Sequence, residues 1–121
     1  MLVVDDDADF LRATAEVLHD MRLHVLTALS SADALRTIDS GAPVDLVISD
    51  VMMPVLSGWQ LLDWIHASYP TLPVILVSAV DLRIAGRKEM LTADHTAFLA
   101  KPFALEELLG LIQRFTTAAT S

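Results

Sequence analysis

Apolar residues along the chain follow two alternating patterns. Short, mostly apolar runs alternate with longer stretches in which apolar residues recur every three or four positions. Runs of the first kind are typical of strands covered on both faces, and stretches of the second kind are typical of amphipathic helices. The expected strands are 2–4, 24–29, 44–50, 74–80 and 96–100, and the expected helices are 8–21, 31–40, 58–69, 81–91 and 104–115.

Residues that begin or end helices support several of these boundaries. Ser30 or Ser31 is suited to cap the helix 31–40, and Gly41 follows its end. The helix 81–91 is the weakest prediction, because Gly86 in its middle costs a helix about 1 kcal/mol. The tail 116–121 has few apolar residues to bury, so we expect it to fray.

The alternation of strands and helices predicts the fold class. Five strand-then-helix units form a doubly wound α/β domain, a five-stranded parallel sheet with five helices distributed over both faces. We expect the flavodoxin-like strand order 2-1-3-4-5, in which the first and third strands flank the point where strand order reverses. The length of 121 residues fits one domain, 1–121, without linkers or repeats.

Composition narrows the function classes. The chain is 54% hydrophobic, yet no apolar stretch approaches the roughly 20 residues of a membrane-spanning helix. A net charge of −8 argues against direct binding to nucleic acid, whose phosphates repel an acidic protein. Cysteine is absent, which excludes disulfides and thiolate metal sites, and no basic apolar leader precedes the first strand. We therefore expect a cytoplasmic protein.

Polar residues lie where four of the five expected strands end. Asp5 and Asp6 follow the first strand, Asp50 ends the third, Ser78 lies near the end of the fourth, and Lys101 follows the fifth. The carboxyl ends of parallel strands share one edge of the sheet, where ligands bind. The three carboxylates repel one another there and need a cation. Mg²⁺, which prefers oxygen ligands and often shares them with a phosphate, fits this set.

The same residues are chemically suited to hold a phosphoryl group. A carboxylate can act as a nucleophile and form an acyl phosphate, and Asp50 stands alone at the end of a central strand. Lys101 supplies a compact positive charge for a phosphoryl oxygen, and Ser78 supplies a hydroxyl donor. The alternative for Asp5 and Asp6 is simple capping of the first helix, the role we assign to Asp7 and Asp9.

Four segments in this order resemble the receiver domain of two-component response regulators. They are "VVDDD" (3–7), "VISDVMMPVLSG" (47–58), "VILVSA" (74–79) and "FLAKPF" (98–103). The resemblance covers nearly the whole chain. It implies that Asp50 is phosphorylated by a partner histidine kinase or phosphotransfer protein. It also implies that Asp5, Asp6, Asp50 and the backbone carbonyl of Met52 bind Mg²⁺.

The resemblance also implies how the phosphoryl group acts. Ser78 and Lys101 match the residues that contact the phosphoryl oxygens, and Phe98 matches an aromatic switch that moves inward with the hydroxyl side chain. The Lys101–Pro102 bond matches a position that is cis in the family. Phosphorylation would shift the surface formed by the fourth helix, the fifth strand and the fifth helix. That surface would control an output domain or a downstream protein.

Several alternatives remain open at this stage. A phosphatase of the haloacid dehalogenase type also uses a nucleophilic aspartate with Mg²⁺, but it has a second aspartate two residues later, where this chain has Met52. A degenerate receiver would bind partners without phosphorylation, and Phe98 could be an immobile core residue. Asp94 stands where the family usually has glycine. We expect no enzymatic turnover beyond self-phosphorylation and dephosphorylation, and either a monomer or a weak dimer.

Overall fold

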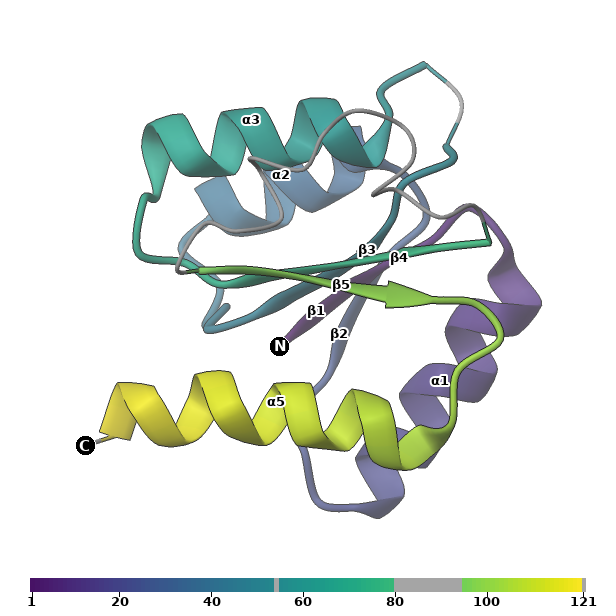
Figure 1. Ribbon diagram of the computed structural model, residues 1–121. Coiled ribbons are helices and arrows are strands. Elements are labelled where there is room, and N and C mark those ends of the chain that lie inside the picture. Colours follow the sequence, from purple (N-terminus) through teal and green to yellow (C-terminus); the bar gives the residue numbers. More distant parts are fainter. Residues whose placement is uncertain (54, 80–94, 121) are drawn as a thin grey trace.

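A five-stranded parallel sheet forms the centre of the computed structural model, which describes residues 1–53, 55–79 and 95–120 (Figure 1). The order is β2-β1-β3-β4-β5, so the first and third strands are neighbours and the order reverses between them, which confirms the predicted topology. The strands are β1 (Leu2–Val4), β2 (Leu26–Ala28), β3 (Val47–Asp50), β4 (Val74–Ser78) and β5 (Thr96–Ala100).

Helices cover both faces of the sheet, as expected for parallel strands (Figure 1). The described helices are α1 (Ala8–Asp20), α2 (Ser31–Asp39), α3 (Gly58–Ser68) and α5 (Leu105–Thr120). In Figure 1, α2 and α3 lie on one side of the sheet and α1 and α5 on the other. The helix expected at 81–91 lies outside the described residues.

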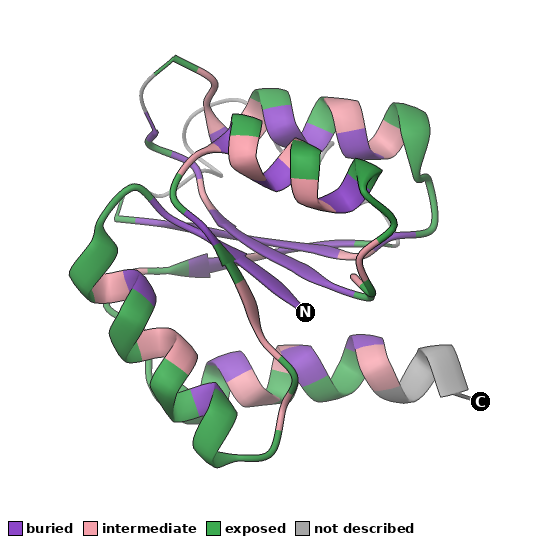
Figure 2. Ribbon diagram, turned by 180° about the vertical axis from the view of Figure 1, so that it is seen from behind, coloured by how far each residue is buried: buried purple, intermediate pink, exposed green. Residues whose placement is uncertain are grey.

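Each face of the sheet has its own hydrophobic core, because successive side chains of a strand point to opposite faces. In β1, Leu2 and Val4 pack with residues of α2 and α3, whereas Val3 packs with residues of α1 and α5. The inner strands β1, β3 and β4 are therefore buried along most of their length, whereas the edge strand β2 is only partly buried. The helices show a buried stripe on an otherwise more exposed surface (Figure 2). These two cores hold the strand ends in a fixed relation to one another.

The helix starts are capped as the sequence suggests. Asp7 is the N-cap of α1, and its carboxylate accepts hydrogen bonds from the backbone N–H groups of Asp9 and Phe10. Ser30 caps α2, which resolves the choice between the two serines. Ser57 caps α3 in a capping box with Gln60. The capping of α1 therefore belongs to Asp7, which leaves the carboxylates of Asp5 and Asp6 available for another role.

Some boundaries differ from those expected. The second strand covers only residues 26–28 of the predicted 24–29, because it pairs with the three residues of β1 alone. Helix α5 extends to Thr120, beyond the end expected at residue 115, and the fraying expected from residue 116 stays a prediction. The Thr116 hydroxyl donates to the Ile112 carbonyl at 2.8 Å within this added turn. Among the described helices, none combines the length and apolar character required to cross a bilayer.

Candidate phosphoryl and metal site

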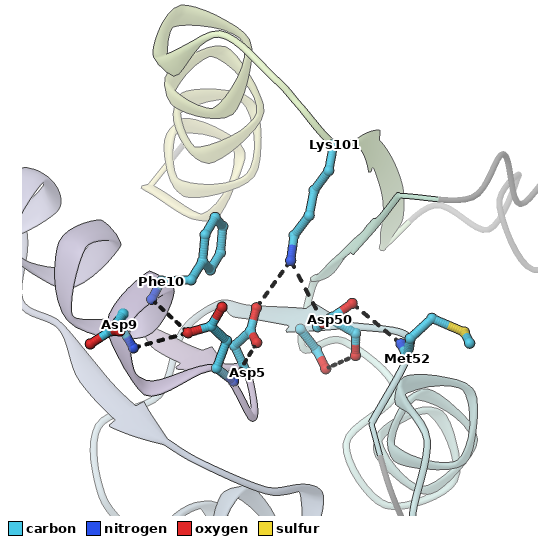
Figure 3. A network of polar contacts seen from close by, with 8 residues as sticks. Asp5, Asp9, Phe10, Asp50, Met52 and Lys101 are labelled. Carbon is cyan, nitrogen blue, oxygen red and sulfur yellow. Dashed lines mark hydrogen bonds and ion pairs between the residues drawn. The ribbon is translucent and has the colours of Figure 1, made fainter.

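Four of the five strands deliver a polar residue to one edge of the sheet. Asp5 follows β1, Asp50 ends β3, Ser78 ends β4 and Lys101 follows β5. Lys101 is the residue whose contacts join these strands, since its ammonium reaches the carboxylates of Asp5 and Asp50 across the gap between them (Figure 3). The expected convergence of residues far apart along the chain is therefore present.

Asp5 is buried, with only 2% of its surface exposed. Its Oδ1 accepts a hydrogen bond of 2.9 Å from the backbone N–H of Asp7, and its Oδ2 accepts one of 3.2 Å from Lys101 Nζ. Its own backbone N–H donates to the Ala28 carbonyl at 3.1 Å, which extends the pairing between β1 and β2. These contacts fix both the backbone and the carboxylate of Asp5.

Asp50 is less buried and more loosely held. Its Oδ1 accepts a hydrogen bond of 3.2 Å from the backbone N–H of Met52, and its Oδ2 lies 3.7 Å from Lys101 Nζ. The Met52 side chain is 65% exposed, so it does not bury the carboxylate. Asp50 therefore combines a defined orientation with access from solvent, which a nucleophilic carboxylate requires.

The carboxylates of Asp5, Asp6 and Asp50 form a cluster that fits a hard divalent cation. One oxygen from each lies within 4.8 Å of the others. Asp5 is buried, Asp50 is half-buried and Asp6 is exposed, so the cluster opens outward from the sheet. Three carboxylates with an open side suit Mg²⁺, which retains several waters beside its protein ligands. The three carboxylates expected from the sequence therefore lie together, and a part for the Met52 backbone carbonyl stays a prediction.

Burial raises the pKa of Asp5 above its ordinary value. Removal of the carboxylate from water is the largest cause, and the nearby negative charge of Asp50 acts in the same direction. The hydrogen bond from the Asp7 backbone and the positive charge of Lys101 lower the pKa of Asp5, but they do not offset the burial. Without a cation, the protein therefore holds a charged Asp5 at a cost in stability.

This raised pKa predicts how the stability of the metal-free protein depends on pH. Because the folded state holds the Asp5 proton more tightly than the unfolded chain, the free energy of unfolding falls as pH rises from about 3.8 through the folded-state pKa. We expect Asp5→Asn to raise the free energy of unfolding at neutral pH in the presence of a chelator and to flatten this decline. Urea unfolding across the acidic-to-neutral range measures both effects.

The exposed Asp9→Asn variant, with the same change in charge, should leave the pH dependence as in the wild type. Addition of Mg²⁺ should stabilise the wild type more than Asp5→Asn, since a ligand that binds only the folded state raises its stability. A metal-free Asp5→Asn protein that is less stable than the wild type at neutral pH would contradict the expectation.

The loop after Asp50 is held at three points. The Val51 backbone N–H donates to the Val77 carbonyl at 3.0 Å, and the Val51 carbonyl accepts from Gly58 at 2.9 Å. The buried Ser31 hydroxyl, in the first turn of α2, donates to the Leu56 carbonyl at 2.9 Å. Both ends of this loop are thus tied to neighbouring elements, which restricts the backbone of Met52.

Gly58 permits a close approach of two backbone segments near the site. A Cβ atom at this position would lie 2.4 Å from the Asp50 carbonyl oxygen and 2.7 Å from Val51 Cα. No side chain fits these distances. The start of α3 therefore packs directly against the end of β3, where it limits movement of the Asp50 backbone.

Ser78 and Lys101 are joined through their backbones, because the Lys101 N–H donates to the Ser78 carbonyl at 2.8 Å. Ser78 is fully buried at the end of β4. The Lys101–Pro102 peptide bond is cis, as the resemblance implied. Phe98 lies on β5 beside Leu76 of β4 and packs, half-buried, against the core on the α2 and α3 side. The expected inward movement of the Phe98 side chain on phosphorylation stays a prediction.

Two aromatic residues near the site escaped the sequence analysis. The ring centre of Phe10 lies 4.1 Å from Lys101 Nζ, and Phe103 meets Phe10 edge to face with ring centres 6.4 Å apart. In the sequence, Phe10 is one of several apolar residues that recur at helical spacing within 8–21, and in the structure it is half-buried. For Phe103, the one indication in the sequence was its position directly after Lys101 and Pro102.

Comparisons with known proteins agree with this geometry. Residues 1–113 match the family model described as the response regulator receiver domain. The transcriptional regulatory protein PrrA of Mycobacterium tuberculosis is 38% identical over 128 residues, an alignment that covers 100% of this chain and 53% of PrrA. The chain thus spans about half the length of this relative.

Solved structures of receiver proteins share the fold. The receiver domain of the Francisella response regulator 1452 superposes with a TM-score of 0.86 at 27% identity, covering 98% of this chain and 96% of that domain. The response regulator TrrA of Thermotoga maritima, solved in complex with Mg²⁺ and BeF, has a TM-score of 0.82 at 26% identity over 94% of this chain and 96% of TrrA. With its strand order, its acidic cluster and these matches, the chain belongs to the response regulator receiver domain family.

Proposed function

We propose that this domain is the phosphoacceptor of a two-component phosphorelay and that Asp50 receives the phosphoryl group from a partner histidine kinase or phosphotransfer protein. One observation supports this above all others. The carboxylates of Asp5, Asp6 and Asp50 lie within 4.8 Å of one another, and Lys101 Nζ lies 3.2 Å from Asp5 and 3.7 Å from Asp50. This arrangement combines a nucleophile, a cation site and a positive charge.

The chemical step transfers one phosphoryl group. A carboxylate oxygen of Asp50 attacks the phosphorus of a phosphohistidine, the P–N bond breaks as the P–O bond forms, and the imidazole leaves with the bonding electron pair. The product is an acyl phosphate on Asp50. The backbone N–H of Met52, 3.2 Å from Oδ1, orients the carboxylate for this attack. Lys101 then exchanges its contact with Asp5 or Asp50 for a phosphoryl oxygen.

Asp5, Asp6, Asp50 and the backbone carbonyl of Met52 are the residues that would hold Mg²⁺. Bound there, the ion would offset the repulsion of the crowded carboxylates and would stabilise negative charge on the phosphoryl oxygens. The buried Asp5 provides a ligand fixed by two hydrogen bonds, and the exposed Asp6 provides one that can follow the ion. The complex of TrrA with Mg²⁺ and BeF is a precedent within the family for such an assembly.

The signal would travel along β5 to the surface expected from the fourth helix, β5 and α5, of which the fourth helix lies outside the described residues. A phosphoryl group adds a charge of about −1.5 to −2 at neutral pH. That charge attracts Lys101, which follows β5, and the hydroxyl of Ser78, which ends the neighbouring strand β4. Phe98 lies on β5 three residues before Lys101, and we expect it to move inward with Ser78. The result is a population shift between two packings of this surface.

The partners follow from the same proposal. A histidine kinase or phosphotransfer protein donates the phosphoryl group, and an output domain or downstream protein reads the altered surface. The first relatives found are transcriptional regulatory proteins about twice as long as this chain, which is consistent with an attached output domain. We propose a cytoplasmic domain that is a monomer or a weak dimer, that uses Mg²⁺ and that makes no direct contact with nucleic acid.

The main alternative is a phosphatase with a nucleophilic aspartate. Such an enzyme needs a second acid near the nucleophile to protonate the leaving group. Two residues after Asp50 the chain has Met52, whose thioether cannot donate a proton. The methionine at this position therefore favours a domain that keeps its phosphoryl group over an enzyme with many turnovers.

Incubation with acetyl phosphate and Mg²⁺ tests the proposal. Intact-mass spectrometry should detect one added phosphoryl group per chain, and chelation of the metal should prevent the addition. Rapid release of phosphate over many turnovers, without a detectable adduct, would identify a phosphatase. An unmodified protein that releases no phosphate would identify a degenerate receiver, and either result would overturn the proposal.

A further inference from the structure

We propose that Phe10 is a positioning residue for Lys101, whose ammonium its ring holds beside Asp50 while leaving the N–H donors free to contact a phosphoryl oxygen. This inference rests on the proposed function, because it assigns to Phe10 a part in phosphorylation of Asp50. Phe10 lies in the first turn of α1, and Lys101 follows β5 at the opposite end of the chain (Figure 3).

The ammonium of Lys101 has three described neighbours at graded distances. Asp5 Oδ2 lies at 3.2 Å and Asp50 Oδ2 at 3.7 Å, and the ring centre of Phe10 lies at 4.1 Å. A cation within about 6 Å of an aromatic ring centre is attracted by the negative face of the ring. The side chain of Lys101 is 24% exposed, so water screens this attraction only in part.

The three neighbours act on the ammonium in different ways. A carboxylate binds an N–H donor along a defined direction, so each contact with Asp5 or Asp50 occupies one of the three donors. The ring of Phe10 attracts the charge without accepting a strong hydrogen bond. The ammonium can therefore leave a carboxylate and contact a phosphoryl oxygen while its interaction with Phe10 persists, which lowers the cost of the exchange.

Phe10 is itself held in place. The ring of Phe103 meets it edge to face, with an interplanar angle of 89°. Phe103 lies two residues after Lys101, so the residues that carry the cation and support the ring belong to the same loop. The Phe10 backbone N–H donates to the N-cap Asp7 at 3.2 Å, which anchors the start of α1. The contact thus links α1 to the loop between β5 and α5 directly at the site.

Substitution of Phe10 by leucine removes the aromatic ring but keeps an apolar side chain. The variant therefore tests the contribution of the ring face separately from that of apolar contact. We expect Phe10→Leu to slow formation of the Asp50 adduct with acetyl phosphate and Mg²⁺ by about three- to tenfold, the effect of one partly shielded cation–π contact. Phe10→Tyr, which keeps the ring, should retain the wild-type rate. Phe115→Leu, the same change in a buried position of α5 far from Lys101 in the chain, should also leave the rate unchanged.

Two readouts distinguish positioning from a general structural role. The ring current of Phe10 should shift the NMR signals of the Lys101 ε-methylene protons upfield in the wild type and in Phe10→Tyr, and the shift should vanish in Phe10→Leu. In a Lys101→Met background, Phe10→Leu should cause no further slowing, because the cation is already absent.

Three results would contradict a positioning role for Phe10. They are equal rates for Phe10→Leu and the wild type, an unchanged ε-methylene shift in Phe10→Leu, and equal slowing in both backgrounds. A wild-type protein that forms no adduct would overturn the proposed function instead, and the NMR comparison would still test whether Phe10 holds Lys101.

Discussion

Asp50→Ala is expected to abolish phosphorylation by acetyl phosphate, leaving a protein whose intact mass does not change. Asp50 is the carboxylate at the end of β3 that combines access from solvent with a hydrogen bond from Met52. Asp5 cannot replace it, because Asp5 is buried and both of its oxygens already accept hydrogen bonds. Alanine leaves no nucleophile at the end of β3, so the loss of the adduct should be complete.

The loss should not result from unfolding. Removal of one of three crowded carboxylates reduces their repulsion, and the negative charge of Asp50 is one cause of the raised pKa of Asp5. We therefore expect metal-free Asp50→Ala to be at least as stable as the wild type in urea unfolding. Asp63→Ala, at an exposed position of α3, should be phosphorylated like the wild type. Addition of a phosphoryl group to Asp50→Ala would place the acceptor elsewhere.

Gly58→Ala is expected to have the largest effect on stability. Its Cβ would lie 2.4 Å from the Asp50 carbonyl oxygen and 2.7 Å from Val51 Cα, and both are backbone atoms that cannot turn aside. Forced repacking of this kind costs typically about 1–3 kcal/mol. The strain falls on the backbone of Asp50, the proposed phosphoacceptor, so the variant should also form the Asp50 adduct more slowly. Urea unfolding and the acetyl phosphate reaction measure the two effects.

Gly110→Ala is a matched control with an effect of opposite sign. Gly110 lies within α5, and a Cβ atom there would meet nothing within 4 Å. Alanine in a helix interior is more favourable than glycine by about 0.5–1 kcal/mol, so this variant should be more stable than the wild type. If Gly58→Ala were equally stabilised, the close approach between α3 and β3 would not constrain the fold.

The fold was predictable because the alternation of short apolar runs with amphipathic stretches is visible in the sequence. Runs such as "VILV" at 74–77 are apolar throughout, and this pattern is typical of a strand buried on both faces. Strand lengths were less predictable, since the three residues of β1 limit how far β2 can pair. The side of a helix that faces the core was also less predictable, because it depends on how the helix packs. In α3, for example, Leu61 is buried and Trp59 is only half-buried.

The residues of the candidate site were predictable for a similar reason. In a parallel sheet, the carboxyl ends of the strands meet at one edge, so Asp5, Asp50 and Lys101 had to approach one another once the topology was known. Contacts that depend on side-chain direction were not predictable. The approach of Phe10 to Lys101 and the bond from Ser31 to the Leu56 carbonyl join elements whose relative placement no local pattern encodes.

Lys101 follows β5, a strand at the margin of the sheet that pairs with β4 alone. A displacement of its end disturbs one row of interstrand hydrogen bonds, whereas the same displacement of β3 would disturb two. The outermost strand can therefore yield to a small electrostatic force while the inner strands stay rigid. Under the proposed function, we therefore expect a single charge to alter the outer surface of the domain while the inner strands that carry the acids keep their places.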